Sequence, residues 1–366
     1  MPRLKEIINI LEAFAPPHLA ESWDNVGLMI GNMSCDVQKV LCALDLNQEV
    51  IEEAIHLGVT CIVTHHPFLF KPIRSIDLES MQGQMIEKLI RHGISVYSMH
   101  TNYDITEGGL NDYLANQLGL KHIQILDNTY EEKLYKGVIY VPCSHLEQVR
   151  DVVIKNMTCD IGEYAGCTFS SLGEGTFIPL EGSKPYIGET GSIEKVNENQ
   201  LSFIGTYQEV SRIIEEVKKV HPYEEVAVDV YLLENMSKVY GIGRYGELEE
   251  ALSLEEFIKK VKQFFNIEHV RVTDLKERFI KRVAICSGAG SDYIKCAAKV
   301  ADVYLTGDLK FHEGQMARAL GITVVDVGHY ASEQIALTPI GDCIQKTFPT
   351  CEVYYSKVNG ETLFIK

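Results

Sequence analysis

The chain has 366 residues, of which 46% are hydrophobic and 23% are charged, as is ordinary for soluble globular proteins. This length exceeds that of most single compact domains, so we expect two or three domains. The formal net charge of −17 repels phosphate backbones and anionic lipids, so neither a nucleic acid nor a membrane is an expected partner.

The amino terminus and the cysteines indicate the cytoplasm. Residues 1–6 lead directly into an amphipathic run and lack the apolar core of a secretion signal. No apolar run approaches the roughly 20 residues of a membrane span. The ten cysteines include no C-x-x-C pair, and reduced thiols are expected in a chain of this size.

The first third of the chain alternates short apolar strands with amphipathic helices. We expect strands at 39–45, 61–64 and 95–99, and helices at 49–56, 81–92 and 111–118. The last third repeats this order, with strands at 282–286, 303–305 and 323–327 and helices at 293–299, 314–320 and 332–346. Such alternation predicts an α/β fold with mainly parallel sheets.

The middle of the chain follows a different plan. Strands are expected at 136–141, 164–169, 173–177 and 225–231, with the second and third paired, and helices at 145–154 and 208–220. The stretch 181–199, rich in Gly, Ser and Glu, is expected to be a long loop or an irregular hairpin. This βαββαβ order is that of a ferredoxin-like α+β module. We therefore predict an α/β core, residues 1–128 and 237–366, interrupted by an inserted module at 129–236.

Histidines and carboxylates gather where the predicted strands end. His65 and His66 follow one strand, and His100 and Asp104 follow the next. Functional residues of open α/β sheets collect at these carboxyl ends. Taken singly, the His-His pair is better explained by an exposed turn, and Asp104 is equally well explained by a helix cap.

Two further strand ends carry the same residue types four positions apart. His329 and Glu333 follow the strand at 323–327, and Asp308 and His312 follow the strand at 303–305. Side chains at this spacing project from one helix face and can bind a common ion. Imidazole and carboxylate ligands suit zinc, manganese, iron or nickel. We therefore predict a divalent-metal site, at which paired ions would favour hydrolysis.

Two other motifs have a simpler structural interpretation. The segment 287–291, Ser-Gly-Ala-Gly-Ser, could cradle a phosphate with its amides but lacks the Walker lysine, so a tight turn is the preferred interpretation. The only tryptophan, Trp23, precedes Asp24 and Asn25. This polar pair could line a pocket, but a turn is preferred here too.

These motifs resemble the GTP cyclohydrolase 1 type 2 homolog family, also called Nif-three-like dinuclear-metal proteins. The matching stretches lie at 23–27, 64–67, 100–104, 306–308 with His312, and 328–329 with Glu333. The resemblance implies a Nif-three-like core and a homohexameric toroid, and the middle module, with residues 221–225, resembles the PII and CutA proteins that are inserted in the longer members. It also implies two divalent ions per subunit, for which zinc is expected and iron or manganese are alternatives. Five residues are implied as their ligands: His65, His66, Asp104, His329 and Glu333.

The same resemblance implies that Glu333 bridges the ions and that His100, Asp308 and His312 lie nearby as candidate catalytic residues. The expected activity is hydrolysis of a nucleotide, such as GTP, or of a related phosphorylated small molecule, with His100 or His312 moving the proton. The alternative is a non-catalytic ring that senses metal or binds partners. An open coordination position would favour the hydrolase, and a closed one the ring.

Overall fold

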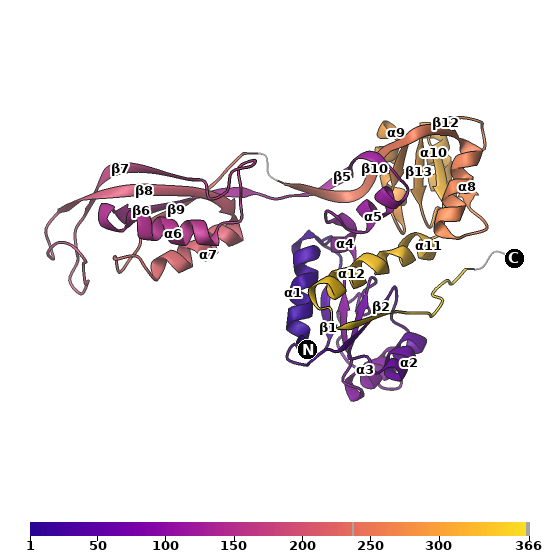
Figure 1. Ribbon diagram of the computed structural model, residues 1–366, viewed down its shortest axis with the longest axis horizontal. Coiled ribbons are helices and arrows are strands. Elements are labelled where there is room, and N and C mark those ends of the chain that lie inside the picture. Colours follow the sequence, from indigo (N-terminus) through magenta and orange to yellow (C-terminus); the bar gives the residue numbers. More distant parts are fainter. Residues whose placement is uncertain (236–237, 364–366) are drawn as a thin grey trace. The chain divides into compact units, whose positions relative to one another are not determined.

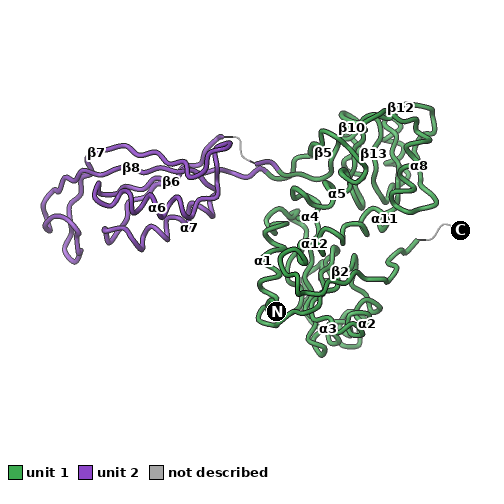
Figure 2. Tube along the Cα trace, viewed as in Figure 1, with its two compact units in different colours: residues 1–130, 240–366 green, residues 131–239 purple. Residues whose placement is uncertain are grey.

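The structure is a computed structural model that describes residues 1–235 and 238–363. The chain divides into two compact units, shown in Figure 2: residues 1–130 and 240–366 form unit 1, and residues 131–239 form unit 2. Of the boundaries predicted for the insert, residue 236 lies outside the described residues. The ten cysteines are free thiols, as expected. None of the described helices has the length and apolarity that crossing a membrane requires.

One sheet of unit 1 has five strands in the order β1-β4-β3-β2-β15 (Figure 1). The strands are β1 (Gly27–Ile30), β2 (Lys39–Ala43), β3 (Cys61–Thr64), β4 (Ser95–Ser98) and β15 (Glu352–Tyr355). All neighbours pair in parallel except β1, which runs antiparallel to β4. Strands β3 and β4 are buried along their whole length, as the apolar run of β3 predicts.

The second sheet of unit 1 has six strands in the order β11-β14-β13-β12-β10-β5. These are β5 (Lys121–Glu131), β10 (Val239–Ser253), β11 (Arg271–Val272), β12 (Phe279–Ile285), β13 (Val303–Thr306) and β14 (Thr323–Asp326). Strands β12, β13 and β14 pair in parallel with one another. Strand β10 pairs with β12, and β11 with β14, in antiparallel orientation. The strands of the alternating segments thus form a parallel centre, as predicted, and strands outside those segments extend it on both sides into a mixed sheet.

Helices cover both sheets and fill the space between them. The helices of unit 1 are α1 (Leu4–Phe14), α2 (Gln48–Leu57), α3 (Met81–Arg91), α4 (Thr101–Ile105), α5 (Leu110–Gln117), α8 (Leu254–Phe265), α9 (Ile294–Val300), α10 (Phe311–Leu320), α11 (His329–Glu333) and α12 (Leu337–Thr347). Short 3-10 turns occur at Pro17–Leu19, Gly290–Tyr293 and Gln334–Ala336. One apolar core joins α1, α5, α8 and α12 to inner faces of both sheets. Separate cores pack α2 and α3 on the first sheet and α9 and α10 on the second.

Local sequence explains why α2 begins and ends where it does. The side chain of Asn47 accepts a hydrogen bond from the Val50 amide, 2.9 Å away, and caps the first turn. Gly58 ends the helix in the left-handed conformation, with φ of 69°, which glycine adopts without a Cβ clash. Helix α2 thereby returns the chain to β3, the strand that leads to His65.

Unit 2 consists of β6 (Leu134–Pro142), α6 (Leu146–Asn156), β7 (Thr168–Phe177), β8 (Glu194–Thr206), α7 (Tyr207–Lys218) and β9 (Val228–Leu232), with a 3-10 turn at Cys143–His145. Its sheet order β7-β8-β6-β9 and its antiparallel pairing are those of a ferredoxin-like module. Helices α6 and α7 pack on one face of the sheet.

The βαββαβ order is as predicted, but two strand assignments in unit 2 are wrong. The segments 164–169 and 173–177 do not pair with each other. Residues 168–177 instead form the single edge strand β7, which pairs with β8. Most of β7 is exposed, so it lacks the regular apolar alternation by which an edge strand can be found. The predicted loop at 181–199 ends earlier, at the start of β8.

Candidate metal centre

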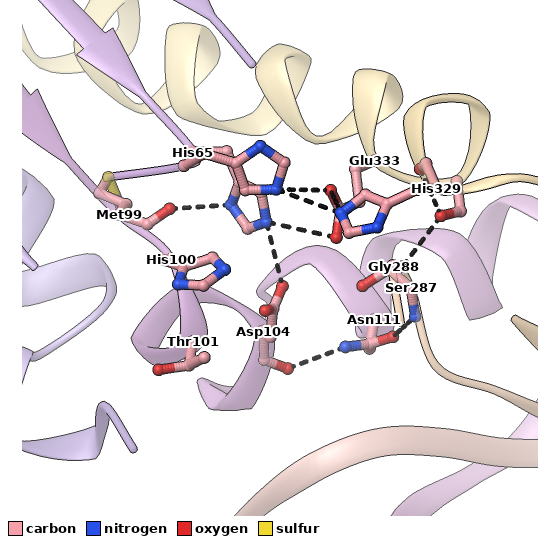
Figure 3. A network of polar contacts seen from close by, with 12 residues as sticks. His65, Met99, His100, Thr101, Asp104, Asn111, Ser287, Gly288, His329 and Glu333 are labelled. Atoms are coloured by element: carbon pink, nitrogen blue, oxygen red, sulfur yellow. Dashed lines mark hydrogen bonds and ion pairs between the residues drawn. The ribbon is translucent and has the colours of Figure 1, made fainter. Parts of the chain in front are cut away.

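The centre is built where strands of both sheets of unit 1 end. His65 and His66 directly follow β3, and His100 follows β4 by one residue. From the second sheet, His329 opens α11 after β14, and Glu333 ends the same helix. Figure 3 shows that these side chains converge on one small volume, with His65 and His329 on opposite sides of Glu333.

Ligand atoms of these residues form two groups that share His66. One group consists of His65, His66 and His100, and the other of His66, His329 and Glu333. Within each group the ligand atoms all lie within 4.8 Å of one another. The two groups therefore mark two neighbouring candidate ion positions, and the single free Nε2 atom of His66 can bind at only one of them.

The distances in the second group fit one ion. The Glu333 Oε2 atom lies 2.9 Å from Nε2 of His66 and 2.9 Å from Nε2 of His329. The two Nε2 atoms are 3.3 Å apart. Ligand atoms that each lie about 2.1 Å from one zinc ion are separated from one another by about 3.0–3.4 Å. These three atoms therefore have the spacing of ligands around a common cation.

The other oxygen of Glu333 faces the first group. Its Oε1 atom lies 3.7 Å from Nε2 of His65. Each oxygen of this carboxylate is therefore directed toward a different group of histidines. A carboxylate with this orientation can connect two ions.

Three buried polar atoms at the centre make no hydrogen bond to any described residue: His65 Nε2, Asp104 Oδ1 and Glu333 Oε2. The contacts of Glu333 Oε2 with Nε2 of His66 and of His329, at 2.9 Å each, are ion pairs. Buried polar atoms left without a partner are costly, at about 1–3 kcal/mol each. Divalent metal ions would provide a partner for all three atoms, so this set of ligand atoms fits divalent metals.

Burial and ion pairing act together on the acidic groups of the centre. Burial raises the pKa of Glu333, but the imidazoles of His329, His65 and His66 outweigh that effect and hold its pKa well below its usual range. Burial raises the pKa of Asp104. The Asp104 carboxylate approaches the centre beside His65, with Oδ1 3.7 Å from Nε2, and belongs to neither ligand-atom group.

Every histidine of the centre has its Nδ1 atom beside an oxygen. The acceptors are the Met99 carbonyl for His65, Asp45 for His66, Asp24 for His100 and Asp308 for His329, at 2.7–2.8 Å. In a neutral ring, an N–H donated from Nδ1 leaves Nε2 without a proton and directs it to a metal. This arrangement is typical of metal-binding histidines and aligns all four rings.

The glycine-rich turn after β12 supports Glu333 from below. Its Ser287, Gly288 and Gly290 amides donate to Asn111, Ser332 and Thr306, so they are not free to cradle a phosphate. A Cβ atom on Gly288 would lie 2.1 Å from Glu333 Oε1. Glycine is therefore required for the close approach of this turn to the carboxylate.

Among the three candidate catalytic residues, the structure places only His100 with the ligand atoms. Asp308 lies behind His329, to which it is hydrogen-bonded. His312 is exposed on α10, where its Nδ1 lies 3.1 Å from Gln315 Oε1. Neither of these two belongs to a ligand-atom group within residues 1–235 and 238–363.

A cavity of about 670 Å³ adjoins the centre. Its lining includes His66, His329, Asp45 and Asp308, together with the segments 267–271 and 360–363. A cavity of this size can hold a small organic molecule. A molecule held there would contact His66 and His329, the two histidines that lie 2.9 Å from Glu333 Oε2.

Three supporting groups were not predicted from the sequence. Asp45 ends the predicted strand 39–45 and could have been found by the strand-end rule that identified the histidines. Asp24 was interpreted as part of a turn, yet it fixes His100 and Thr101 through its carboxylate. The Met99 carbonyl carries no sequence signal, because every residue has a carbonyl.

Comparison with known proteins identifies the family. The model of the Duf34/NIF3 (NGG1p interacting factor 3) family matches residues 2–361. The chain belongs to the Duf34/NIF3 family. This membership confirms the expected Nif-three-like fold.

Relatives of this Duf34/NIF3 chain are similar over most of their length. It is 43% identical to the GTP cyclohydrolase 1 type 2 homolog of Halalkalibacterium halodurans over 88% of this chain and 87% of that protein. It is 41% identical to the Bacillus subtilis protein of the same name, over 90% and 88%. The crystal structure of a Bacillus cereus protein related to NIF3 superposes with a TM-score of 0.90, at 36% identity, over 100% and 99% of the two chains.

Proposed function

We propose that this Duf34/NIF3 protein is a metal-dependent hydrolase that acts on a nucleotide or a related phosphorylated small molecule. The observation that carries the proposal is the set of buried ligand atoms on His65, Asp104 and Glu333 that have no hydrogen-bond partner and that divalent cations would satisfy. The names of the similar proteins from H. halodurans and B. subtilis support the choice of a nucleotide.

Two divalent ions would be held by His65, His66, Asp104, His329 and Glu333, with His100 close enough to add a ligand. When bound, such ions polarise a substrate oxygen and lower the pKa of water, which makes hydrolysis accessible near neutral pH. Zinc is the proposed metal, with iron or manganese as alternatives. A homohexamer in the cytoplasm is the proposed assembly, by resemblance to the family.

The residues of the chain contribute orientation and proton transfer. Asp45 and Asp308 fix the rings of His66 and His329, so the ligand set is held before substrate arrives. His100 is anchored at Nδ1 by Asp24, and its side chain is 17% exposed. Its Nε2 atom can therefore take a proton from, or give one to, a group bound at the centre.

The test is turnover of a panel of nucleotides and phosphoesters, including GTP, by protein loaded separately with zinc, manganese or iron. We expect metal-dependent product release that is abolished in both His65→Ala and Glu333→Ala. His92, an exposed histidine at the end of α3, provides the matched control, and His92→Ala should retain full activity. Two bound ions per chain with no turnover of any substrate would favour the non-catalytic ring instead.

A further inference from the structure

The only tryptophan of the chain lies exposed beside the metal centre. Trp23 is 58% exposed, and Phe70, 44% exposed, lies next to it with ring centroids 6.0 Å apart and planes inclined by 49°. The rings of Trp23 and His100 pack edge to face, with their centroids 6.1 Å apart. A large, exposed aromatic pair is unusual outside binding surfaces.

The loop that carries Trp23 is fixed on both sides. The Glu21 amide donates to Thr101 Oγ1 at 3.0 Å, and the Thr101 amide donates to Asp24 Oδ2 at 3.1 Å. The side chain of Asn25 donates to the Leu69 carbonyl at 2.5 Å, which ties this loop to the segment that carries Phe70. The aromatic pair is therefore held in place although it is exposed.

The position of the pair relates it to the metal centre. His100 separates Trp23 from the metal-binding histidines, and its ring centroid lies 5.3 Å from that of His65 and 5.5 Å from that of His66. A planar group stacked on Trp23 would be separated from the ligand atoms of His65 and His66 by the ring of His100. The rest of the same molecule could then extend to the metals.

We propose that Trp23 and Phe70 form a stacking site for a planar heteroaromatic ring, such as the base of a nucleotide, and so favour substrates that carry such a ring. Tryptophan and phenylalanine faces bind flat rings by stacking and are tolerant of the ring's identity. This inference rests on the proposed function for the reacting end of the substrate, but stacking itself can be measured without turnover.

The test uses the fluorescence of Trp23, because no other tryptophan contributes to the emission. Metal-loaded protein is titrated with guanosine, GTP or inorganic triphosphate, with a free tryptophan analogue to correct for absorption by the base. We expect saturable quenching by guanosine and GTP but not by triphosphate. No saturable quenching by guanosine or GTP, or equal quenching by triphosphate, would overturn the proposal.

Variants locate the site. Phe70→Ala should weaken binding of guanosine about 5- to 100-fold, the range expected for loss of one aromatic stacking partner. Phe279, 78% exposed on β12, is the matched control, and Phe279→Ala should bind normally. By calorimetry, Trp23→Leu should lose binding and Trp23→Phe should retain most of it. Unchanged affinity in Trp23→Leu, with or without a changed oligomeric mass, would overturn the proposal and assign the pair to another role.

The outcomes separate this proposal from the hydrolase. Nucleotide turnover with an unchanged KM in Trp23→Leu would refute the stacking site and leave the hydrolase intact. Saturable stacking of guanosine without turnover by any metal form would refute the hydrolase and leave the stacking site intact. Thermal unfolding of each variant shows whether the fold is retained.

Discussion

The Nδ1 atom of His329 lies 2.7 Å from Oδ2 of Asp308. Asp308 has a φ of 54°, a left-handed conformation that aspartate and asparagine tolerate better than most residues. Asp308 lies just after β13, and its left-handed backbone places its carboxylate behind the ring of His329. Asp308 therefore acts on the centre through the orientation of His329, and its test is metal binding.

Asp308→Asn should lower zinc affinity about 10- to 100-fold, the range for loss of a supporting carboxylate behind a metal-binding histidine. Asparagine keeps the shape and the left-handed backbone but not the charge, so the melting temperature should change little. Affinity is measured by competition with a chelator. Asp342, exposed on α12, provides the control, and a similar loss in Asp342→Asn would contradict a specific role for Asp308.

Gly288 tests how closely the turn after β12 must approach Glu333. An alanine there would place Cβ 2.1 Å from Glu333 Oε1, in a backbone with φ of +58°. Gly288→Ala should displace the carboxylate and reduce zinc affinity by at least about tenfold.

Gly58 offers a control with the same backbone strain and no clash. It has φ of +69° and nothing within 4 Å of the added Cβ. Both substitutions should cost about 1 kcal/mol of folding free energy through the left-handed backbone. Gly58→Ala should nevertheless bind zinc normally. Equal zinc affinity in the two variants, measured by the same chelator competition, would show that the turn does not position Glu333.

Metal binding should release protons at neutral pH. Burial lowers the pKa of His66, but the carboxylates of Asp45 and Glu333 outweigh that effect and raise the pKa to about 10. Glu333 and Asp308 raise the pKa of His329 to about 9. In the metal-free protein at pH 7 both rings are therefore protonated, and each must lose a proton before Nε2 can bind a metal.

Calorimetry of zinc binding in buffers of different ionisation enthalpy counts these protons. We expect about two protons released per chain at pH 7, and zinc affinity that rises with pH until about pH 9–10. The folding stability of the metal-free protein should change with pH in the opposite direction to the zinc affinity. The raised pKa values stabilise the fold fully below about pH 6.5, and this contribution is lost as the pH rises through 9 and 10. Zinc binding without proton release at pH 7 would contradict these shifts.

The strand ends of the centre could be predicted from sequence because continuous apolar runs mark buried strands. The run 61–64 coincides with β3, and the histidines that follow it lie where the strand-end rule places them. Asp104 was equally well explained as a helix cap, and the structure shows its side chain buried beside His65. Sequence pattern alone does not distinguish these two environments.

Other features could not be predicted because their causes are non-local. Strand β10 joins the second sheet only after the chain has passed through unit 2, so no neighbouring sequence indicates its antiparallel pairing with β12. The edge strand β7 is mostly exposed and lacks apolar alternation. His312 shares the four-residue spacing of the His329–Glu333 pair, yet its side chain is exposed, because spacing does not determine which helix face is turned to the centre.

The most direct test of the account is the metal content of zinc-loaded protein, measured by elemental analysis of wild type, Glu333→Ala and His92→Ala. Glu333 directs one oxygen to His65 and the other to His66 and His329, so both ion positions should depend on it. We predict two zinc ions per chain in wild type and in His92→Ala, and at most one in a folded Glu333→Ala variant. Two zinc ions in Glu333→Ala, or none in wild type, would contradict a dinuclear centre built on this carboxylate.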